Sequence, residues 1–288
     1  MVNRLRLAAR IFAALLLAAS VAGCAYLAEK QGELIFRPTK GEWWGFRNAN
    51  VAYEDRWIPV GTNGDQLHAY WAKADDPAAP VLLYLHGARW NLTGSVTRIE
   101  RWRNLGFNVL AIDYRGFGRS TDISPTESLA YEDAETAWDW IGRAEPGRAR
   151  IIVGHSLGGA VAAELAVRRP EATGVVLEAT FTSIRDMVEH TAWRFMPVGL
   201  ILTQEFNTLA KIPRIQAPLL IVHGTNDAIV PFEMGERLFS AATSPRKRFI
   251  RVEGGSHHNL SAMAFEQYRT AVRELFRAPR SLEAGAPG

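Results

Sequence analysis

The feature that most constrains the fold is a series of short, uninterrupted apolar segments, with longer amphipathic stretches between them. Such segments are typical of strands that are covered on both faces, as in a parallel sheet. They are Val81–Leu85, Val109–Ile112, Ile151–Val153, Val175–Leu177 and Leu219–Val222. Because helical stretches alternate with these segments, the pattern predicts an α/β chain with a doubly wound, mostly parallel sheet.

An antiparallel start to the sheet is predicted upstream of this series. Two strand-like segments, Arg56–Val60 and Gln66–Ala72, flank a turn at residues 61–65, and the second of them alternates apolar with polar residues. We expect residues 24–280 to form a single domain, which is an ordinary size for one α/β core. Residues 281–288, which are rich in Ala, Gly and Pro, are expected to form a disordered tail.

The pentapeptide Gly154–Gly158, Gly-His-Ser-Leu-Gly, lies between the strand-like segment 151–153 and a helical stretch. In this setting the motif is typical of a turn that presents a nucleophilic serine at the end of a strand. The turn is so tight that a side chain at either glycine would collide with its neighbours. The pattern predicts Ser156 as the nucleophile, with the ring of His155 pointing away from it.

A serine hydroxyl needs a neighbouring base, and histidine titrates nearest to neutral pH. Of the seven histidines, His257 and His258 follow the last strand-like segment, where a doubly wound sheet returns the chain to its strand ends. Asp227 follows the preceding strand and is the candidate for the carboxylate that orients the base. The chain order is therefore nucleophile, acid and base, with either histidine as the base.

Residues 30–277 resemble the α/β-hydrolases, and among them the lysophospholipase-like and serine-aminopeptidase-like hydrolases and the eukaryotic protein depalmitoylases. The segments that carry the resemblance are Leu85–Ala88, Asp113–Ser120, Gly154–Gly159, Gly224–Asp227 and Glu253–His257. The resemblance implies the α/β-hydrolase fold and a triad of Ser156, Asp227 and His257, because relatives place the base three residues after the glycine that Gly254 matches.

The same resemblance implies an oxyanion hole made by the backbone N–H groups of Ala88 and Leu157. The chain departs from the depalmitoylases at Ala88, where they often have Asn. The following Arg89 is interpreted as a surface residue and Trp90 as a packed one, and alternatively both line the mouth of the substrate pocket. No cofactor is expected. No metal is expected either, because adjacent histidines diverge and chelate poorly without further ligands.

The first 23 residues resemble a bacterial lipoprotein signal peptide. Three arginines precede a short apolar run, and Val21–Cys24 resembles the site at which such a signal is cut before a lipid-modified cysteine. We expect Cys24 to anchor the chain in the bacterial cell envelope, on the periplasmic face and at the outer membrane. Residues 1–23 also account for the whole formal net charge of +3 of the chain. The remaining residues are therefore close to neutral and show no basic character that would indicate a nucleic-acid partner.

Residues 181–215 interrupt the strand and helix alternation with an apolar, helical segment. We interpret it as a short helical cap above Ser156, and alternatively as an ordinary crossover helix.

The expected function is a serine hydrolase that cleaves ester or thioester bonds in a small-molecule or lipid-like acyl substrate. A second hypothesis is an aminopeptidase that holds the substrate ammonium group, and a third is a non-catalytic envelope lipoprotein. The acidic residues available to the second are Glu178, Asp186, Glu189 and Glu205.

Overall fold

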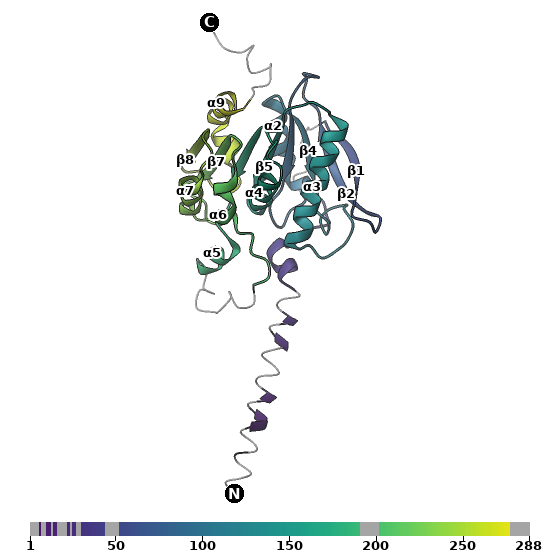
Figure 1. Ribbon diagram of the computed structural model, residues 1–288, viewed down its shortest axis with the longest axis vertical. Coiled ribbons are helices and arrows are strands. Elements are labelled where there is room, and N and C mark those ends of the chain that lie inside the picture. Colours follow the sequence, from purple (N-terminus) through teal and green to yellow (C-terminus); the bar gives the residue numbers. More distant parts are fainter. Residues whose placement is uncertain are drawn as a thin grey trace.

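The computed structural model describes residues 30–43, 52–190 and 202–276, with scattered helical positions between 6 and 26. Eight strands form one sheet (Figure 1). The strands are β1 (Glu54–Val60), β2 (Asp65–Ala72), β3 (Val81–Leu85), β4 (Asn108–Ile112), β5 (Arg150–His155), β6 (Gly174–Glu178), β7 (Leu219–Gly224) and β8 (Lys247–Val252).

The strand order in the sheet is β1-β2-β4-β3-β5-β6-β7-β8. The β1–β2 and β2–β4 pairs are antiparallel, and every later pair is parallel. The chain leaves β3 toward β4 on one side and reaches β5 on the other, so the winding reverses between β3 and β5. Ligands bind open α/β sheets at the carboxyl end of such a reversal. The predicted doubly wound, mostly parallel sheet is confirmed.

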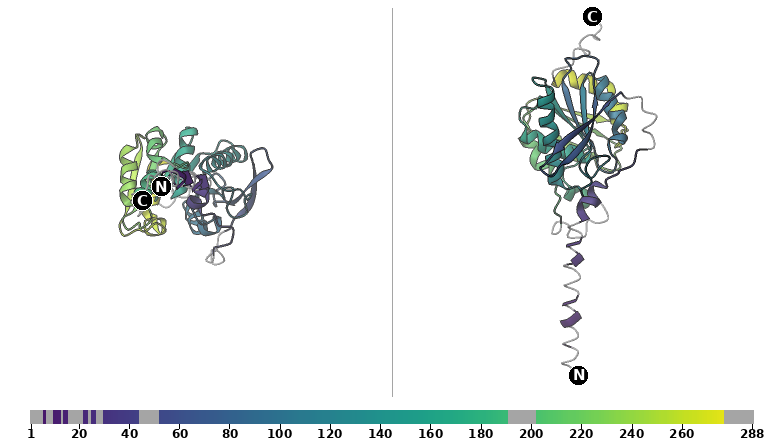
Figure 2. Two further views of the ribbon diagram at one scale, coloured as in Figure 1. Left: turned by 90° about the horizontal axis from the view of Figure 1, so that it is seen from below. Right: turned by 90° about the vertical axis from the view of Figure 1, so that its right-hand side faces the viewer.

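Helices cover both faces of the sheet (Figure 2). Neighbouring residues of β5 belong to hydrophobic cores on opposite faces of the sheet. Ile152 belongs to one core with Trp138 and Leu165, and Val153 belongs to the other with Trp102 and Tyr268. The helices are α2 (Val96–Asn104), α3 (Glu127–Ala144), α4 (Leu157–Arg168), α5 (Ile184–Glu189), α6 (Thr208–Lys211), α7 (Phe232–Ala241), α8 (Leu260–Met263) and α9 (Phe265–Leu275), with 3₁₀ turns η2 (Leu92–Ser95) and η5 (Ile212–Arg214).

Asp113, at the end of β4, fixes the loop that follows β3. Its Oδ1 accepts the N–H of Leu92 at 2.8 Å and lies 3.4 Å from Nε2 of His86. Burial raises the pKa of Asp113, but polar contacts with the rings of His68 and His86, at 3.6 Å and 3.4 Å, outweigh it and leave the pKa below its usual value. The ionised Asp113 side chain therefore holds the loop that follows β3 in place through Leu92 and His86.

The segment between β6 and β7 has two different parts. The first contains α5, which lies beyond the end of the sheet where β6 finishes (Figure 1). In the second part Phe206, Ile212 and Ile215 are completely buried in the core, as expected for a crossover. Residues 191–201, which hold most of the apolar cluster of the predicted cap, lie outside the described residues, so the cap over 181–215 stays a prediction.

The ends of the predicted domain are not covered by the structure. Cys24 and residues 277–288 lie outside the described residues. Among the helical residues that are described, none belongs to a helix with the length and apolar character that a membrane crossing needs. The signal peptide, the lipid anchor and the disordered tail remain predictions.

Candidate active site

Ser156 stands alone between β5 and α4, in a backbone conformation that residues other than glycine seldom adopt. Its φ of 56° and ψ of −120° are strained, at a cost of about 1–3 kcal/mol. Three hydrogen bonds hold it there. The Ser156 N–H donates to the carbonyl of Glu178 at 2.8 Å, and the Ser156 carbonyl accepts from Gly159 N–H at 2.9 Å and Thr180 Oγ1 at 2.7 Å.

The two glycines of the pentapeptide are required by close backbone contacts. A Cβ added at Gly154 would lie 2.1 Å from the carbonyl oxygen of Gly158, and one added at Gly158 would lie 2.1 Å from that of Leu85. Both obstacles are main-chain atoms that cannot rotate away. The predicted collision at either glycine is therefore confirmed.

We expect Gly158→Ala to lower the free energy of unfolding by at least about 2 kcal/mol, because overpacking costs this much where the neighbours are backbone atoms. Helix propensity alone would give the opposite sign, since alanine is favoured over glycine by about 1 kcal/mol inside a helix. Urea denaturation measures the difference. Gly41→Ala is the control, since its methyl group would meet nothing within 4 Å. A stabilised Gly158→Ala protein would contradict this account.

His257 and Asp227 form a hydrogen-bonded pair. Nδ1 of His257 lies 2.8 Å from Oδ2 of Asp227, whose side chain is fully shielded from solvent. Oδ1 accepts the N–H groups of Ile229 at 2.8 Å and Val230 at 2.9 Å. Burial raises the pKa of Asp227, but the 3.4 Å contact with Nε2 of His223 and the hydrogen bond from His257 more than offset this and hold the pKa far below its usual value. Asp227 is therefore ionised at neutral pH.

Ser156 and His257 line the same cavity, of about 240 Å³, together with Ala88. Their exposed fractions are 9% and 5%, so both reach the cavity only at their tips. Within the described residues the Ser156 hydroxyl makes no hydrogen bond, and it faces the cavity without a direct link to His257. Catalytic contacts are often loose before a substrate is bound. The structure thus brings all three predicted residues to one place.

The predicted direction of His155 is wrong. His155 lines the cavity beside Ser156, and its Nε2 donates to the carbonyl of His257 at 2.9 Å. Burial lowers the pKa of His155 far below its ordinary value, with repulsion from Arg98 and His257 adding to it. A neutral His155 can keep its proton on Nε2 and support the His257 loop. The motif pattern holds no signal for this contact, because its partner lies 102 residues away.

His258 also lines the cavity, with its ring 5.0 Å from that of His257. It makes no contact with Asp227 comparable to that of His257, which favours His257 as the base. Burial lowers the pKa of His258 to about 4, and repulsion from His257 and Arg98 contributes. His258 is therefore neutral near pH 7.

Lowering the pH from 7.5 to 5 is expected to reduce the free energy of unfolding. The unfolded chain binds protons at His155 and His258 below about pH 6.5, whereas the folded chain resists them, so the stability present above pH 6.5 is lost as the pH falls toward 4. Urea denaturation at a series of pH values measures the loss. His258→Asn should show a smaller loss, and an unchanged loss in this variant would contradict the assignment.

The two predicted oxyanion-hole donors are free. Within the described part of the chain, the N–H groups of Ala88 and Leu157 donate to no acceptor, although Leu157 is only 2% exposed. Unpaired N–H groups at buried positions are rare, and an oxyanion would satisfy them.

The interpretation of Trp90 as a packed residue is wrong, because it is 45% exposed and lines the cavity together with the exposed Arg89.

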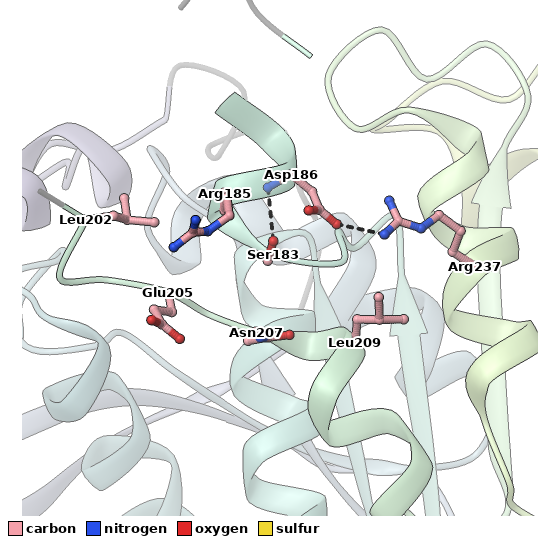
Figure 3. A pocket seen from close by; sticks show the side chains of 8 residues that line it. All are labelled: Ser183, Arg185, Asp186, Leu202, Glu205, Asn207, Leu209 and Arg237. Atoms are coloured by element: carbon pink, nitrogen blue, oxygen red, sulfur yellow. Dashed lines mark hydrogen bonds and ion pairs between the residues drawn. The ribbon is translucent and has the colours of Figure 1, made fainter. Parts of the chain in front are cut away.

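The acidic residues considered for an aminopeptidase do not line this cavity. Asp186 and Glu205 line a different cavity of about 330 Å³, and there Asp186 pairs with Arg237 at 3.1 Å (Figure 3). Glu178 is 2% exposed beneath the turn, and Glu189 is exposed on α5. No group of three or more His, Cys, Asp or Glu side chains in the described ranges is arranged to hold a metal ion.

Comparison with known proteins places this chain and its fold in a family. The family model described as serine aminopeptidase S33 matches residues 76–210 and 200–261. The chain belongs to this family of α/β-hydrolases. The predicted fold class and family resemblance are confirmed, and membership identifies the protein as a hydrolase.

Several relatives of this family are similar over most of the chain. An uncharacterized protein of Mycobacterium tuberculosis is 34% identical over 209 residues, which cover 72% of this chain and 73% of the relative. The α/β-hydrolase domain-containing protein WAV2 of Arabidopsis thaliana is 30% identical over 261 residues, covering 82% and 84%. The lysophosphatidylserine lipase ABHD12 of Gallus gallus is 35% identical over 212 residues, 66% of this chain but only 54% of the lipase.

Solved structures agree on the fold. The esterase Pf2001 of Pyrococcus furiosus superposes with a TM-score of 0.65 at 20% identity, over 83% of this chain and 96% of the esterase. Est1E of Butyrivibrio proteoclasticus, solved with ferulic acid, gives a TM-score of 0.62 at 18% identity, over 76% and 96%. At these identities the likeness concerns the fold alone.

Proposed function

We propose that the protein is a serine hydrolase that cleaves carboxylic ester or thioester bonds through an acyl-enzyme, with Ser156, His257 and Asp227 as its triad. The observation that carries this proposal is the 2.8 Å bond between His257 Nδ1 and a solvent-shielded Asp227, beside a cavity that both His257 and Ser156 line. An ionised acid that binds Nδ1 leaves Nε2 of the imidazole unprotonated and able to accept a proton.

In the first half-reaction the Ser156 oxygen attacks the acyl carbonyl carbon, and His257 Nε2 takes the hydroxyl proton. The carbonyl oxygen becomes an oxyanion, which the free N–H groups of Ala88 and Leu157 stabilise. Collapse of the intermediate breaks the bond to the leaving group, which receives the proton from His257. Water then attacks the acyl-enzyme with His257 again as base, releasing the carboxylic acid and restoring Ser156.

An ester or thioester substrate is favoured over a peptide with a free amino terminus. An aminopeptidase needs a carboxylate that faces the substrate ammonium group, and the cavity that holds Ser156 has no Asp or Glu among its described lining residues. The segment 191–201, outside the description, contains no acidic residue either. The name of the ABHD12 relative, a lysophosphatidylserine lipase, supports a lipid-like acyl substrate.

We also propose that Cys24 carries the lipid anchor and tethers the hydrolase to the envelope. The support is the sequence of residues 1–24 alone. Growth with a labelled fatty acid should label the wild-type chain and not Cys24→Ser. Label on both proteins, or on neither, would overturn the anchor and leave the proposed chemistry untouched.

The test of the proposed function compares p-nitrophenyl esters of graded acyl length with aminoacyl-arylamides. We expect ester turnover, labelling of Ser156 by a fluorophosphonate probe, and slow or no release of the arylamine. Preferential cleavage of the arylamides would favour the aminopeptidase instead. If the protein shows no turnover and no labelling, the proposal is overturned and the non-catalytic lipoprotein remains.

A further inference from the structure

The cavity that holds Ser156 carries positive charge that its own lining does not neutralise. Two arginines line it: Arg89 in the loop after β3, and Arg98 on α2. No Asp or Glu is among the described lining residues, and Asp227 lies shielded behind His257. Among the described lining residues, a substrate that enters this cavity therefore meets two guanidinium groups and no carboxylate.

Most of the hydrogen-bonding capacity of Arg98 is unused. Its Nη2 donates to the carbonyl of His258 at 3.2 Å. A second contact, 3.4 Å to Nε2 of His155, is not a true hydrogen bond, because that nitrogen already donates its proton to the carbonyl of His257 at 2.9 Å. No ion pair to Arg98 occurs in the described part of the chain. A guanidinium has five N–H donors, so several remain for a ligand.

Arg89 is held in place by its main chain. Its φ of 78° is uncommon outside glycine. The N–H of Arg89 donates to the carbonyl of Phe36 at 2.7 Å, and its carbonyl accepts from the hydroxyl of Thr39, so residues 36–39 fix this conformation. The Arg89 side chain is exposed at the cavity and has no ion pair within the described ranges. In the sequence, Arg89 directly follows Ala88, the proposed oxyanion donor.

The start of α2 adds to the positive field. Gly94 and Ser95 line the cavity where this nine-residue helix begins, and the N-terminal end of a helix carries a partial positive charge. Arg98 lies on the first turn of the same helix. The two arginines and the helix terminus therefore act on the same small volume of about 240 Å³.

We propose that Arg98 and Arg89 form an anion-binding subsite of the nucleophile cavity, and that the preferred substrates are acyl esters carrying a phosphate or carboxylate near the scissile bond. This inference rests on the proposed function, with Ser156 as nucleophile. Guanidinium groups bind both anions through paired N–H donors. The subsite would hold the substrate's charged group while its ester carbonyl faces Ser156.

The test compares three hexanoyl esters that differ only in charge: hexanoyl-glycerol, hexanoyl-glycerol phosphate and the hexanoyl ester of glyceric acid. The readout is the ratio of kcat/KM for each anionic ester to that for the neutral one. We expect a wild-type ratio above one that falls at least about tenfold in Arg98→Gln and less in Arg98→Lys, which keeps the charge but loses the fork. Whichever anionic ester gives the larger ratio identifies the preferred anion.

The controls separate this inference from the proposed function. Arg143→Gln, which removes an exposed arginine from the last turn of α3, should leave the ratio unchanged. A wild-type ratio near one, or a ratio that Arg98→Gln does not alter, would overturn the subsite while ester turnover upheld the proposed function. Binding of the same esters to the Ser156→Ala protein decides the matter without turnover: equal affinity for charged and neutral esters overturns the subsite even if nothing is hydrolysed.

Discussion

Replacing Ser156 by alanine is expected to lower kcat for p-nitrophenyl esters by at least about 10,000-fold, the scale on which serine hydrolases lose activity with their nucleophile. The covalent acyl-enzyme cannot form, and the residual rate is what the oxyanion donors and substrate binding supply. KM and the free energy of unfolding should change little, because the Ser156 hydroxyl makes no hydrogen bond within the described residues. Steady-state kinetics and urea denaturation measure both.

Labelling by a fluorophosphonate probe checks the same change without turnover. The wild-type chain should be labelled at Ser156, and Ser156→Ala should not be labelled at all. Ser244→Ala is the control, because Ser244 is also a buried serine, at 3% exposure, and does not line the cavity. Equal labelling of wild type and Ser156→Ala would show that another residue is the nucleophile.

The sequence was sufficient to predict those parts of the fold that depend on local pattern. Each uninterrupted apolar segment became a strand of the parallel sheet, because a strand buried on both faces has no polar alternation to display. The turn at Ser156 was equally predictable, since a Cβ added at either of its two glycines would lie 2.1 Å from a backbone oxygen, which excludes any side chain there. Position in the chain order then brought Asp227 and His257 to neighbouring strand ends.

The parts that could not be predicted depend on contacts between distant residues. The ring of His155 turns into the cavity because a carbonyl from the His257 loop is there to accept its proton. The sequence left open whether Arg89 lines the cavity, because the contacts that decide it come from Phe36 and Thr39, which hold its main chain from some 50 residues upstream. Arg98 has no ion pair among the described residues, because the buried carboxylate of Glu178 acts on it only from a distance, and this arrangement becomes visible only after folding. Arg89 and Arg98 give the site its positive charge, so the sequence predicts the reaction better than the substrate.

Exchanging Asp227 for asparagine should be nearly as damaging as losing the nucleophile, with kcat lower by about 10,000-fold. The two N–H groups of Ile229 and Val230 already donate to Oδ1, so the amide oxygen of the introduced asparagine would take that place. Its NH₂ group would then face Nδ1 of His257. The imidazole can meet an amide donor only with an unprotonated Nδ1, which moves its proton to Nε2 and leaves no acceptor for the Ser156 proton.

Kinetics and unfolding together distinguish a wrong tautomer of His257 from a loss of the fold in this variant. Asp227→Asn should keep its KM and unfold cooperatively, whereas kcat at neutral pH should fall. Asp186→Asn is the matched control, because Asp186 is an aspartate that pairs with Arg237 in a different cavity, away from His257. If Asp227→Asn retained more than about a tenth of the wild-type kcat, the carboxylate would not be setting the tautomer of His257. The 2.8 Å contact would then be a structural hydrogen bond between two loops.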